Sequence, residues 1–390
     1  MDKIRFLGAE NEISRVPFGS ILKETREKTT VENEDTLLSC AINGIFRNDE
    51  LFSHFRGSST IGYIKVKKND LILSAQNLHL GNANVNLRFE HGIISPAYKV
   101  YRITGAEPEY IAQWVKRPAA NQFFLAATTE GASQCRKNID WDALYRQPIV
   151  LPSSDEQKKI AKLLMSLDFQ IAFEKIEVRK LKDFKSAMLT KMFPKEGKTE
   201  PEIRFPGFTD AWEQRKFEEI AVRSSVMSDK KGLPRVEYED IISGAGRLNK
   251  DIKLKESEKV GIVFHKGDVL YGKLRPYLQN WLLASFNGLA VGDFWVLQPQ
   301  NTDSSFLYRL VQSQQFDEVA NQSTGTKMPR ADWKLVSKTK FAMPHSVDEQ
   351  AAIGAYFEHL DTLITLHQRK HEKLIDTKKA FLEKLIGGEK

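Results

Sequence analysis

The chain has 390 residues, of which 41% are hydrophobic, so it is long enough for two or three domains with apolar cores. Its 58 lysine and arginine residues outnumber its 51 aspartate and glutamate residues. This mild excess permits a polyanionic partner without requiring one. Two cysteines, Cys40 and Cys135, are too few for a disulfide framework or a cysteine-rich zinc site. The N-terminus lacks an apolar signal segment and no apolar run reaches about 18 residues, so we expect a soluble, cytoplasmic protein.

The chain starts with a segment that recurs later. Ile4-Arg5-Phe6 returns as Ile203-Arg204-Phe205, 199 residues further on. More matches follow, and the distance between matching residues shrinks steadily to 192 at Trp141 and Trp333. Scattered loop deletions in two diverged copies would leave such a drift. The pattern predicts an internal duplication across the whole chain.

The first part of each copy, roughly residues 4–150 and 203–343, is rich in strand patterns. Each contains two short runs of strand-forming residues joined by a polar turn. We expect these strands at 62–66, 70–73, 261–264 and 268–271. Short helices are predicted at 108–115 and 303–313, so the globular parts are of mixed α+β type. The polar segment 194–201 begins with a proline and is the predicted linker.

The second part of each copy is a long helical periodicity, roughly 155–193 and 348–386. Apolar residues recur at alternating steps of four and three, which is the seam pattern of a coiled coil. The first seam is Ile160, Leu164, Leu167, Ile171, Glu174, Val178, Leu181, Lys185, Met188 and Met192, and the second runs likewise from Ile353 to Leu385. Helices of about 33 residues are rods of about 50 Å. A lone seam is typical of a dimer zipper, whereas duplication within one chain favours an internal antiparallel pair with a pseudo-two-fold axis.

Two glycine-rich motifs fail on a required residue. Residues 267–274 fit the spacing of a phosphate-binding loop, but Leu274 stands where a serine or threonine would hold magnesium. Residues 240–246 resemble a methyl-donor loop, and residues 95–98 resemble an amino-methyltransferase signature in which Ala97 replaces the second proline. Glycine and proline are common in ordinary turns, which explains these matches better, so we expect neither a nucleotide site nor a methyl-donor site in this chain.

His367 and His371 lie four residues apart in the second helical pattern, which is the spacing of two zinc ligands. No glutamate follows His367 and no third ligand is evident. Two seam histidines are the better interpretation, and we expect no metal site and no catalytic residues.

Two pairs of loops without acidic residues combine cations, amides and aromatic rings, and are the candidate binding surface. Lysine and arginine suit phosphates, whereas paired hydrogen bonds from amides and arginine suit base edges. From the loop 271–281 and its counterpart 76–86 the candidates are Lys273, Arg275, Tyr277, Gln279, Asn280, Gln76, Asn77, His79 and Asn82. From the second loop pair they are Thr326, Lys327, Arg330, Gln134, Arg136 and Lys137. Ordinary solvated surface loops are the alternative for any one of them.

With the duplication, the paired helices and these loops, the chain resembles the specificity subunits of type I restriction-modification systems. The resemblance spans the full length. It rests on a Gly-Asp strand turn, a Gly-Thr loop before a tryptophan, and a proline followed by Glu-Gln at the start of each long helix. In this sequence these are Gly267-Asp268, Gly325-Thr326 with Trp333, Pro152 with Glu156-Gln157, and Pro344 with Glu349-Gln350.

The central segment Phe205–Glu213 also looks like the segment that opens the family's second target-recognition domain. The first half departs from the pattern. Asn69 replaces the glycine before Asp70, and Ser133 replaces the threonine of the second loop.

The resemblance implies an α+β fold with two target-recognition domains separated by two long antiparallel helices. On this interpretation residues 1–150 are the first target-recognition domain and 151–194 the first spacer helix. Residues 195–343 are the linker and the second target-recognition domain, and 344–390 the second spacer helix.

The resemblance further implies a non-catalytic subunit whose halves each recognise one part of a bipartite double-stranded DNA target. Its partners would be two methyltransferase subunits that use S-adenosylmethionine on adenine, and two restriction and translocation subunits that use ATP and magnesium. A solitary DNA adenine methyltransferase and a duplicated coiled-coil scaffold that binds no nucleic acid remain the alternatives.

Overall fold

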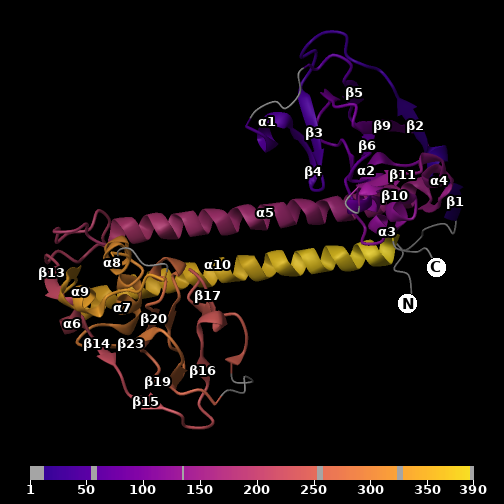
Figure 1. Cartoon of the computed structure of the whole chain (residues 1–390). Coiled ribbons are helices and arrows are strands. Elements are labelled where there is room, and N and C mark those ends of the chain that lie inside the picture. The colour runs from indigo at the N-terminus through magenta and orange to yellow at the C-terminus, as the bar shows by residue number, and fades with distance from the viewer. Residues whose placement is uncertain (1–12, 54–58, 134–135, 253–257, 323–327, 387–390) are drawn as a thin grey trace. The chain divides into compact units, whose positions relative to one another are not determined.

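The computed structural model describes residues 13–53, 59–133, 136–252, 258–322 and 328–386. The chain divides into two compact units. Unit 1 contains Met1–Glu174 and Lys370–Lys390, and unit 2 contains Lys175–Arg369. The two longest helices, α5 (Ser154–Met192) and α10 (Val347–Phe381), each contribute a stretch to both units (Figure 1).

Unit 1 is built on two four-stranded sheets. The first has the order β2 (Leu22–Thr25), β9 (Tyr98–Ile103), β6 (Asp70–Ser74) and β7 (Ala83–Val85). The second has the order β4 (Gly44–Arg47), β3 (Leu37–Ala41), β8 (His91–Ile94) and β5 (Ile64–Lys67). Two further pairs are β1 (Ile13–Pro17) with β12 (Pro148–Pro152) and β10 (Thr128–Ser133) with β11 (Arg136–Ile139).

Short helices complete the globular part of unit 1. They are η1 (Phe18–Ile21), α1 (Asn48–Leu51), η2 (Leu78–Leu80), α2 (Pro108–Trp114), α3 (Ala120–Leu125) and α4 (Trp141–Arg146). Aromatic rings form the centre of its core, with Phe18 stacked on Trp114 at 5.5 Å between ring centroids. Ile160 and Leu164 of α5 join the same core, as do Leu382 and Ile386 of the π-helix η6 (Leu382–Ile386), which continues α10.

Unit 2 repeats the order of the first sheet, and its second sheet shares three strands with that of unit 1 but has its fourth strand at the opposite edge. Its first sheet is β14 (Ala221–Ser224), β23 (Phe294–Pro299), β20 (Val269–Gly272) and β21 (Trp281–Leu283). Its second sheet is β15 (Met227–Ser228), β19 (Gly261–Phe264), β22 (Gly288–Ala290) and β16 (Arg235–Val236). The remaining pairs are β13 (Glu213–Lys216) with β24 (Lys340–Met343) and β17 (Ile241–Ile242) with β18 (Arg247–Leu248).

Short helices also complete the globular part of unit 2, and all but η3 have a counterpart in unit 1. They are α6 (Phe217–Ile220), η3 (Tyr238–Asp240), η5 (Pro276–Leu278), α7 (Ser304–Leu310), α8 (Gln314–Ala320) and α9 (Trp333–Lys338). Phe193 stacks on Phe306 of α7 at 5.6 Å, and both belong to a core that includes Ile353 and Phe357 of α10. Figure 1 shows α7 and β20 beside the first half of α10.

The predicted strands and turns of both globular parts are confirmed. The strands β5, β6, β19 and β20 lie within a residue or two of the predicted ranges. The turns before β6 and β20 require a left-handed residue, with φ of 70° at Asn69 and 95° at Gly267. Asparagine and glycine are the residues that most readily adopt this conformation, which explains how Asn69 replaces a glycine.

The Glu-Gln pair at the start of each long helix joins that helix to its globular part. In unit 1, Gln157 accepts a hydrogen bond from the backbone of Glu107, the N-cap of α2. In unit 2, Gln350 accepts one from the backbone of Asp303, the N-cap of α7. Both glutamines are buried and also donate to a backbone carbonyl just before the helix. The motif therefore anchors a short helix against the long one in the same way in both units.

Within each unit, α5 and α10 run antiparallel. In unit 1, Asp168 pairs with Lys378 and Glu174 with Lys370. In unit 2, Lys185 pairs with Asp361. Every predicted seam position is buried or half-buried, so the step of four and three identified the packed face correctly. Among the described residues no helix is long and apolar enough to cross a membrane.

Candidate nucleic-acid interface

Residues 273–280 connect β20 to β21 in unit 2 and carry five of the predicted site residues. The ends of this loop are joined by a hydrogen bond from the Gly272 amide to the Asn280 carbonyl, 2.7 Å long. Between them lies the short helix η5, flanked by Arg275 and Gln279 with φ of 50° and 55°. Two non-glycine residues in the left-handed region are unusual in one loop and indicate a backbone held by its surroundings.

Two neighbouring segments hold loop 273–280 in place. The Lys273 amide donates to the carbonyl of Asp293 (2.9 Å), and the Arg275 amide donates to the carbonyl of Pro329 (2.7 Å). The Ala331 amide donates back to the Lys273 carbonyl at 2.9 Å. The described end of the second predicted loop, Pro329 and Arg330, therefore lies beside loop 273–280, and Arg330 comes next to Lys273.

A carboxylate lies between these cations. Asp293 is 3.5 Å from Lys273 Nζ and 3.1 Å from Arg330 Nη2. The Arg330 guanidinium, by hydrogen bonding and by charge, and then Lys273 hold the pKa of Asp293 below its usual range. The loops themselves carry no acidic residue, as predicted, and this acid comes from a third segment that the fold brings next to them. In the sequence, the one indication that Asp293 belongs to this site is that it corresponds to Ala97 in the internal duplication.

A half-buried tyrosine stabilises this arrangement through its hydroxyl group. The Tyr238 hydroxyl accepts a hydrogen bond from the Leu274 amide and donates one to the Asp293 carbonyl, both 2.8 Å long. Burial raises the pKa of Tyr238, so the hydroxyl stays protonated at neutral pH. Tyr238 thus ties loop 273–280 to Asp293, a role that its sequence position did not indicate.

The side chains of loop 273–280 differ in what they offer to solvent. Tyr277 is 56% exposed, and Gln279 is also exposed. Lys273 and Arg275 are half-buried, and Arg275 Nε is a buried donor without a hydrogen-bond partner among the described residues. Asn280 is 6% exposed and accepts a hydrogen bond from Ser243, so its side chain serves the fold.

Unit 1 has the same backbone arrangement in residues 75–82, which connect β6 to β7. The Ser74 amide donates to the Asn82 carbonyl, and the Ala75 amide donates to the Ala97 carbonyl. Gly81, with φ of 87°, takes the left-handed position that Gln279 occupies in unit 2. Loops 75–82 and 273–280 are therefore equivalent, although no charged side chain of loop 75–82 corresponds to Lys273.

The predicted residues of loop 75–82 divide into surface and core. Gln76 and Asn77 are exposed, and His79 is half-buried with a buried Nδ1 that has no partner among the described residues. Asn82 is 5% exposed and bonds to Cys40 of β3 through both its oxygen and its amide nitrogen. The Asn82 side chain therefore joins two sheets, as Asn280 does by bonding to the residue after β17.

Only part of the second predicted loop of unit 1 lies within the described residues. Lys137 is half-buried on β11, and in the strand register its backbone lies opposite Glu130 of β10, as that of Arg136 lies opposite Ser133. Gln134, Thr326 and Lys327 lie outside the described residues.

The excluded motifs occupy ordinary structural positions. Residues 240–246 include β17 and the turn of the β17–β18 hairpin, and residues 95–98 are the turn before β9 together with Tyr98, the first residue of that strand. The glycine-rich segment 267–274 is a strand followed by the three-residue helix η5, not the long helix of a phosphate loop. Among the described residues, no group of three or more His, Cys, Asp or Glu residues could hold a metal ion.

Comparison with known proteins gives consistent matches. The family profile of the type I restriction modification DNA specificity domain matches residues 209–375. The type I restriction enzyme MjaVIII specificity subunit of Methanocaldococcus jannaschii is 24% identical over 294 residues, covering 68% of this chain and 67% of the relative. The EcoDI specificity subunit of Escherichia coli is 22% identical over 275 residues, covering 62% of each.

A solved structure shares the fold over nearly the whole length. The S subunit of a type I restriction-modification system from M. genitalium superimposes with a TM-score of 0.60 at 12% identity, covering 99% of both chains. The profile and the curated relatives show that the chain is similar to the specificity subunits of type I restriction-modification systems, and the solved structure shows that it shares their fold.

Proposed function

We propose that this chain gives a type I restriction-modification complex its DNA sequence specificity. In this proposal each globular part binds one part of a bipartite double-stranded target. Unit 2 does so through loop 273–280 and Arg330, and unit 1 through loop 75–82 and β11. The chain itself carries no catalysis. Neither a solitary methyltransferase nor a scaffold without nucleic acid is favoured, because the relatives are specificity subunits and the methyl-donor motifs are turns.

One observation carries the proposal: the same backbone arrangement occurs twice with different side chains. Lys273 and Asp293 in unit 2 correspond to Ala75 and Ala97 in unit 1 through the same backbone hydrogen bond. Equal backbones with unequal side chains are what two domains need when each recognises a different base sequence. The amides of Gln76 and Asn77 suit base edges, and the cations of unit 2 suit phosphates or guanine.

The long helices support a second part of the proposal, a fixed distance between the two half-sites. α5 has 39 residues and α10 has 35, and each passes from one unit into the other. In the proposed arrangement they form one antiparallel pair with a pseudo-two-fold axis, and the internal duplication places a recognition domain at either end. A continuous helical pair would hold the domains at one separation.

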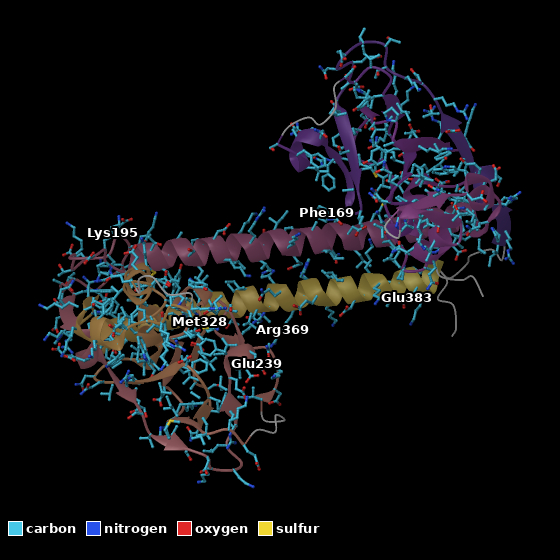
Figure 2. All side chains as sticks on the ribbon, viewed as in Figure 1. Phe169, Lys195, Glu239, Met328, Arg369 and Glu383 are labelled. Carbon is cyan, nitrogen blue, oxygen red and sulfur yellow. The ribbon has the colours of Figure 1, made fainter. Side chains whose placement is uncertain are left out.

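Partner subunits are the third part of the proposal. We infer two methyltransferase subunits that use S-adenosylmethionine and two restriction subunits that use ATP and magnesium. Met165, Phe169 and Phe173 of α5 follow each other at four-residue steps on one face of the helix. They are 37%, 73% and 49% exposed, with Phe169 labelled in Figure 2. Such a row of exposed apolar side chains on one helix is suited to packing against another protein.

Exchange of one globular part tests whether each part recognises its own half of the target independently. Residues 1–150 are replaced by the equivalent part of a relative, and the chimaera is expressed with its methyltransferase partner. Mapping methylated adenines should show one half of the target changed and the other half retained. A change in both halves would contradict independent recognition.

Lengthening both helices tests the fixed distance. Four residues are inserted in α5 after Glu174 and four in α10 after Arg369, which adds about 6 Å and a rotation of some 40°. Because DNA rises about 3.4 Å per base pair, the methylated half-sites should stay the same and move apart by about one to two base pairs. An unchanged spacing would show that the helices do not set it.

A further inference from the structure

Asp361 links three helices of unit 2 through one carboxylate. Its Oδ1 accepts a hydrogen bond from Lys185 Nζ of α5 at 2.6 Å. Its Oδ2 accepts one from Arg309 Nη1 of α7 at 2.7 Å. Since Asp361 itself lies on α10, this side chain joins both long helices to the globular part.

Asp168 makes the equivalent link in unit 1 with the long helices exchanged. Its Oδ1 accepts from Lys378 Nζ of α10 at 2.5 Å, and its Oδ2 accepts from Gln113 Nε2 of α2 at 3.0 Å. Asp168 and Asp361 are 193 residues apart in the sequence, as are Lys185 and Lys378. The helix α2 corresponds to α7, so both units have the same three-way joint.

The two lysines occupy positions in a seam that is mostly apolar. The side chain of Lys185 is 13% exposed and that of Lys378 is 15% exposed. Burial lowers the pKa of Lys185, and Asp361 opposes this effect. An ammonium group at such a position is tolerated only where a carboxylate meets it.

This requirement selects one alignment of the helices. Apolar seam residues pack almost equally well after a shift along the helix, whereas a buried charge has a partner in one alignment only. A shift by one turn would separate both lysines from their aspartates. Leaving buried charges unpaired is strongly unfavourable, so the two joints exclude shifted alignments.

We propose that Asp168 and Asp361 are positioning residues that fix the alignment of α5 against α10 and couple each recognition domain to the helix pair. They would thereby set the number of base pairs between the two half-sites. The inference rests on the proposed function, because it requires the helix pair to determine that spacing. The third partner is charged in unit 2 (Arg309) and neutral in unit 1 (Gln113), so the joints also differ in strength.

The test begins with exchange of the two charges in unit 1. Unit 1 is suitable because the Gln113 amide, which donates to Asp168, can also accept a hydrogen bond from a lysine in its place. Asp168→Lys and Lys378→Asp are made singly and together, in the full chain expressed with its methyltransferase partner. Each single variant should methylate the same half-sites at more than one spacing, differing by about one to two base pairs for a shift of one turn. The double variant should return to the single original spacing.

A second variant removes the charges without leaving one unpaired. Lys185→Met, Asp361→Leu and Arg309→Met together should keep the chain folded, as judged by thermal unfolding, and still broaden the spacing. The matched control is Lys180→Met, which removes an exposed ion pair with Glu177 on α5 and should leave the spacing unchanged.

The outcomes separate this inference from the function on which it rests. If folded variants keep one unchanged spacing, the joints do not fix the alignment and the inference is overturned. If the unaltered protein directs no bipartite methylation at all, the proposed function itself fails.

Discussion

Loops 75–82 and 273–280 show how two equivalent regions of one chain diverge. Both join the third strand of a four-stranded sheet to its fourth, edge strand, and both end in a buried asparagine, Asn82 or Asn280. At the position of Ala75 in unit 1, unit 2 has Lys273, which pairs with Asp293 and so lies beside Arg330. The comparison teaches that both loops keep the same backbone hydrogen bonds and the same buried asparagine. The side chains at the surface differ between them.

The largest difference that we expect between the loops is in their response to salt. Lys273→Ala with Arg330→Ala should weaken binding of the full chain to DNA roughly 10- to 100-fold at about 0.15 M salt, because two phosphate contacts are lost. The slope of log K against log salt should become shallower by about two. Titration of labelled duplex by fluorescence anisotropy at several salt concentrations measures both quantities.

The matched control is Gln76→Ala with Asn77→Ala in unit 1. These uncharged side chains should alter base preference and leave the salt slope as it was. Equal slopes for both double variants and the unaltered chain would show that loop 273–280 does not contact phosphates.

One substitution in each of the turns before β6 and β20 should have a different effect on stability. Gly267→Ala places a Cβ at φ of 95° and 3.2 Å from Ser304 Oγ, so we expect a destabilisation of unit 2 by about 1–2 kcal/mol. Asn69→Gly should change unit 1 by only a few tenths of a kcal/mol, because Asn69 already adopts a left-handed conformation that glycine accepts.

Peptide-resolved hydrogen exchange measures these effects separately in each unit. Amides of β19 and β20 should exchange faster in Gly267→Ala, with those of β5 and β6 unaffected. Unchanged protection of β20 would contradict the strained turn.

The smallest effect should come from Asp293, the acid that lies beside loop 273–280 and has no counterpart beside loop 75–82. Asp293→Asn removes a negative charge next to two cations, so binding to DNA of any sequence should tighten a few-fold and the salt slope should steepen. Discrimination between sequences should fall, because Lys273 and Arg330 lose the group that positions them. Competition between target and random duplexes measures this, and a variant with unaltered affinity and discrimination would exclude the role.

The stabilising effect of Asp293 should depend on pH, which the same variant can reveal. The pKa of Asp293 is lowered in the folded chain, so the stabilisation from its ion pairs is present above the unfolded pKa of about 3.9. That stabilisation is lost as the pH falls through the lower folded value. The difference in unfolding midpoint between the unaltered chain and Asp293→Asn should therefore be constant near neutral pH and disappear in acid. A difference that changes between pH 6 and 8 would point to another group.

Local sequence patterns were sufficient to predict the helices, strands and turns discussed above, and the packed faces of the long helices. The seam of α5 and α10 follows from the spacing of apolar residues, and the turns at Asn69 and Gly267 follow from polar residues between strand patterns. These features depend on residues close together in the chain, so periodicity and turn chemistry identify them. The duplication and the Glu-Gln motifs were equally visible.

Tertiary structure alone decided which side chains from distant segments meet. Asp293 reaches Lys273 and Arg330 because β23 and β20 are neighbours in one sheet. Asn82 is buried because the sheet that contains Cys40 packs against its loop, although amides in a polar loop predict exposure. The joints at Asp168 and Asp361 need a third partner from α2 or α7, which helical spacing does not reveal. The physical reason is that an ion pair or a buried amide depends on distance in space, whereas a sequence pattern records only distance along the chain.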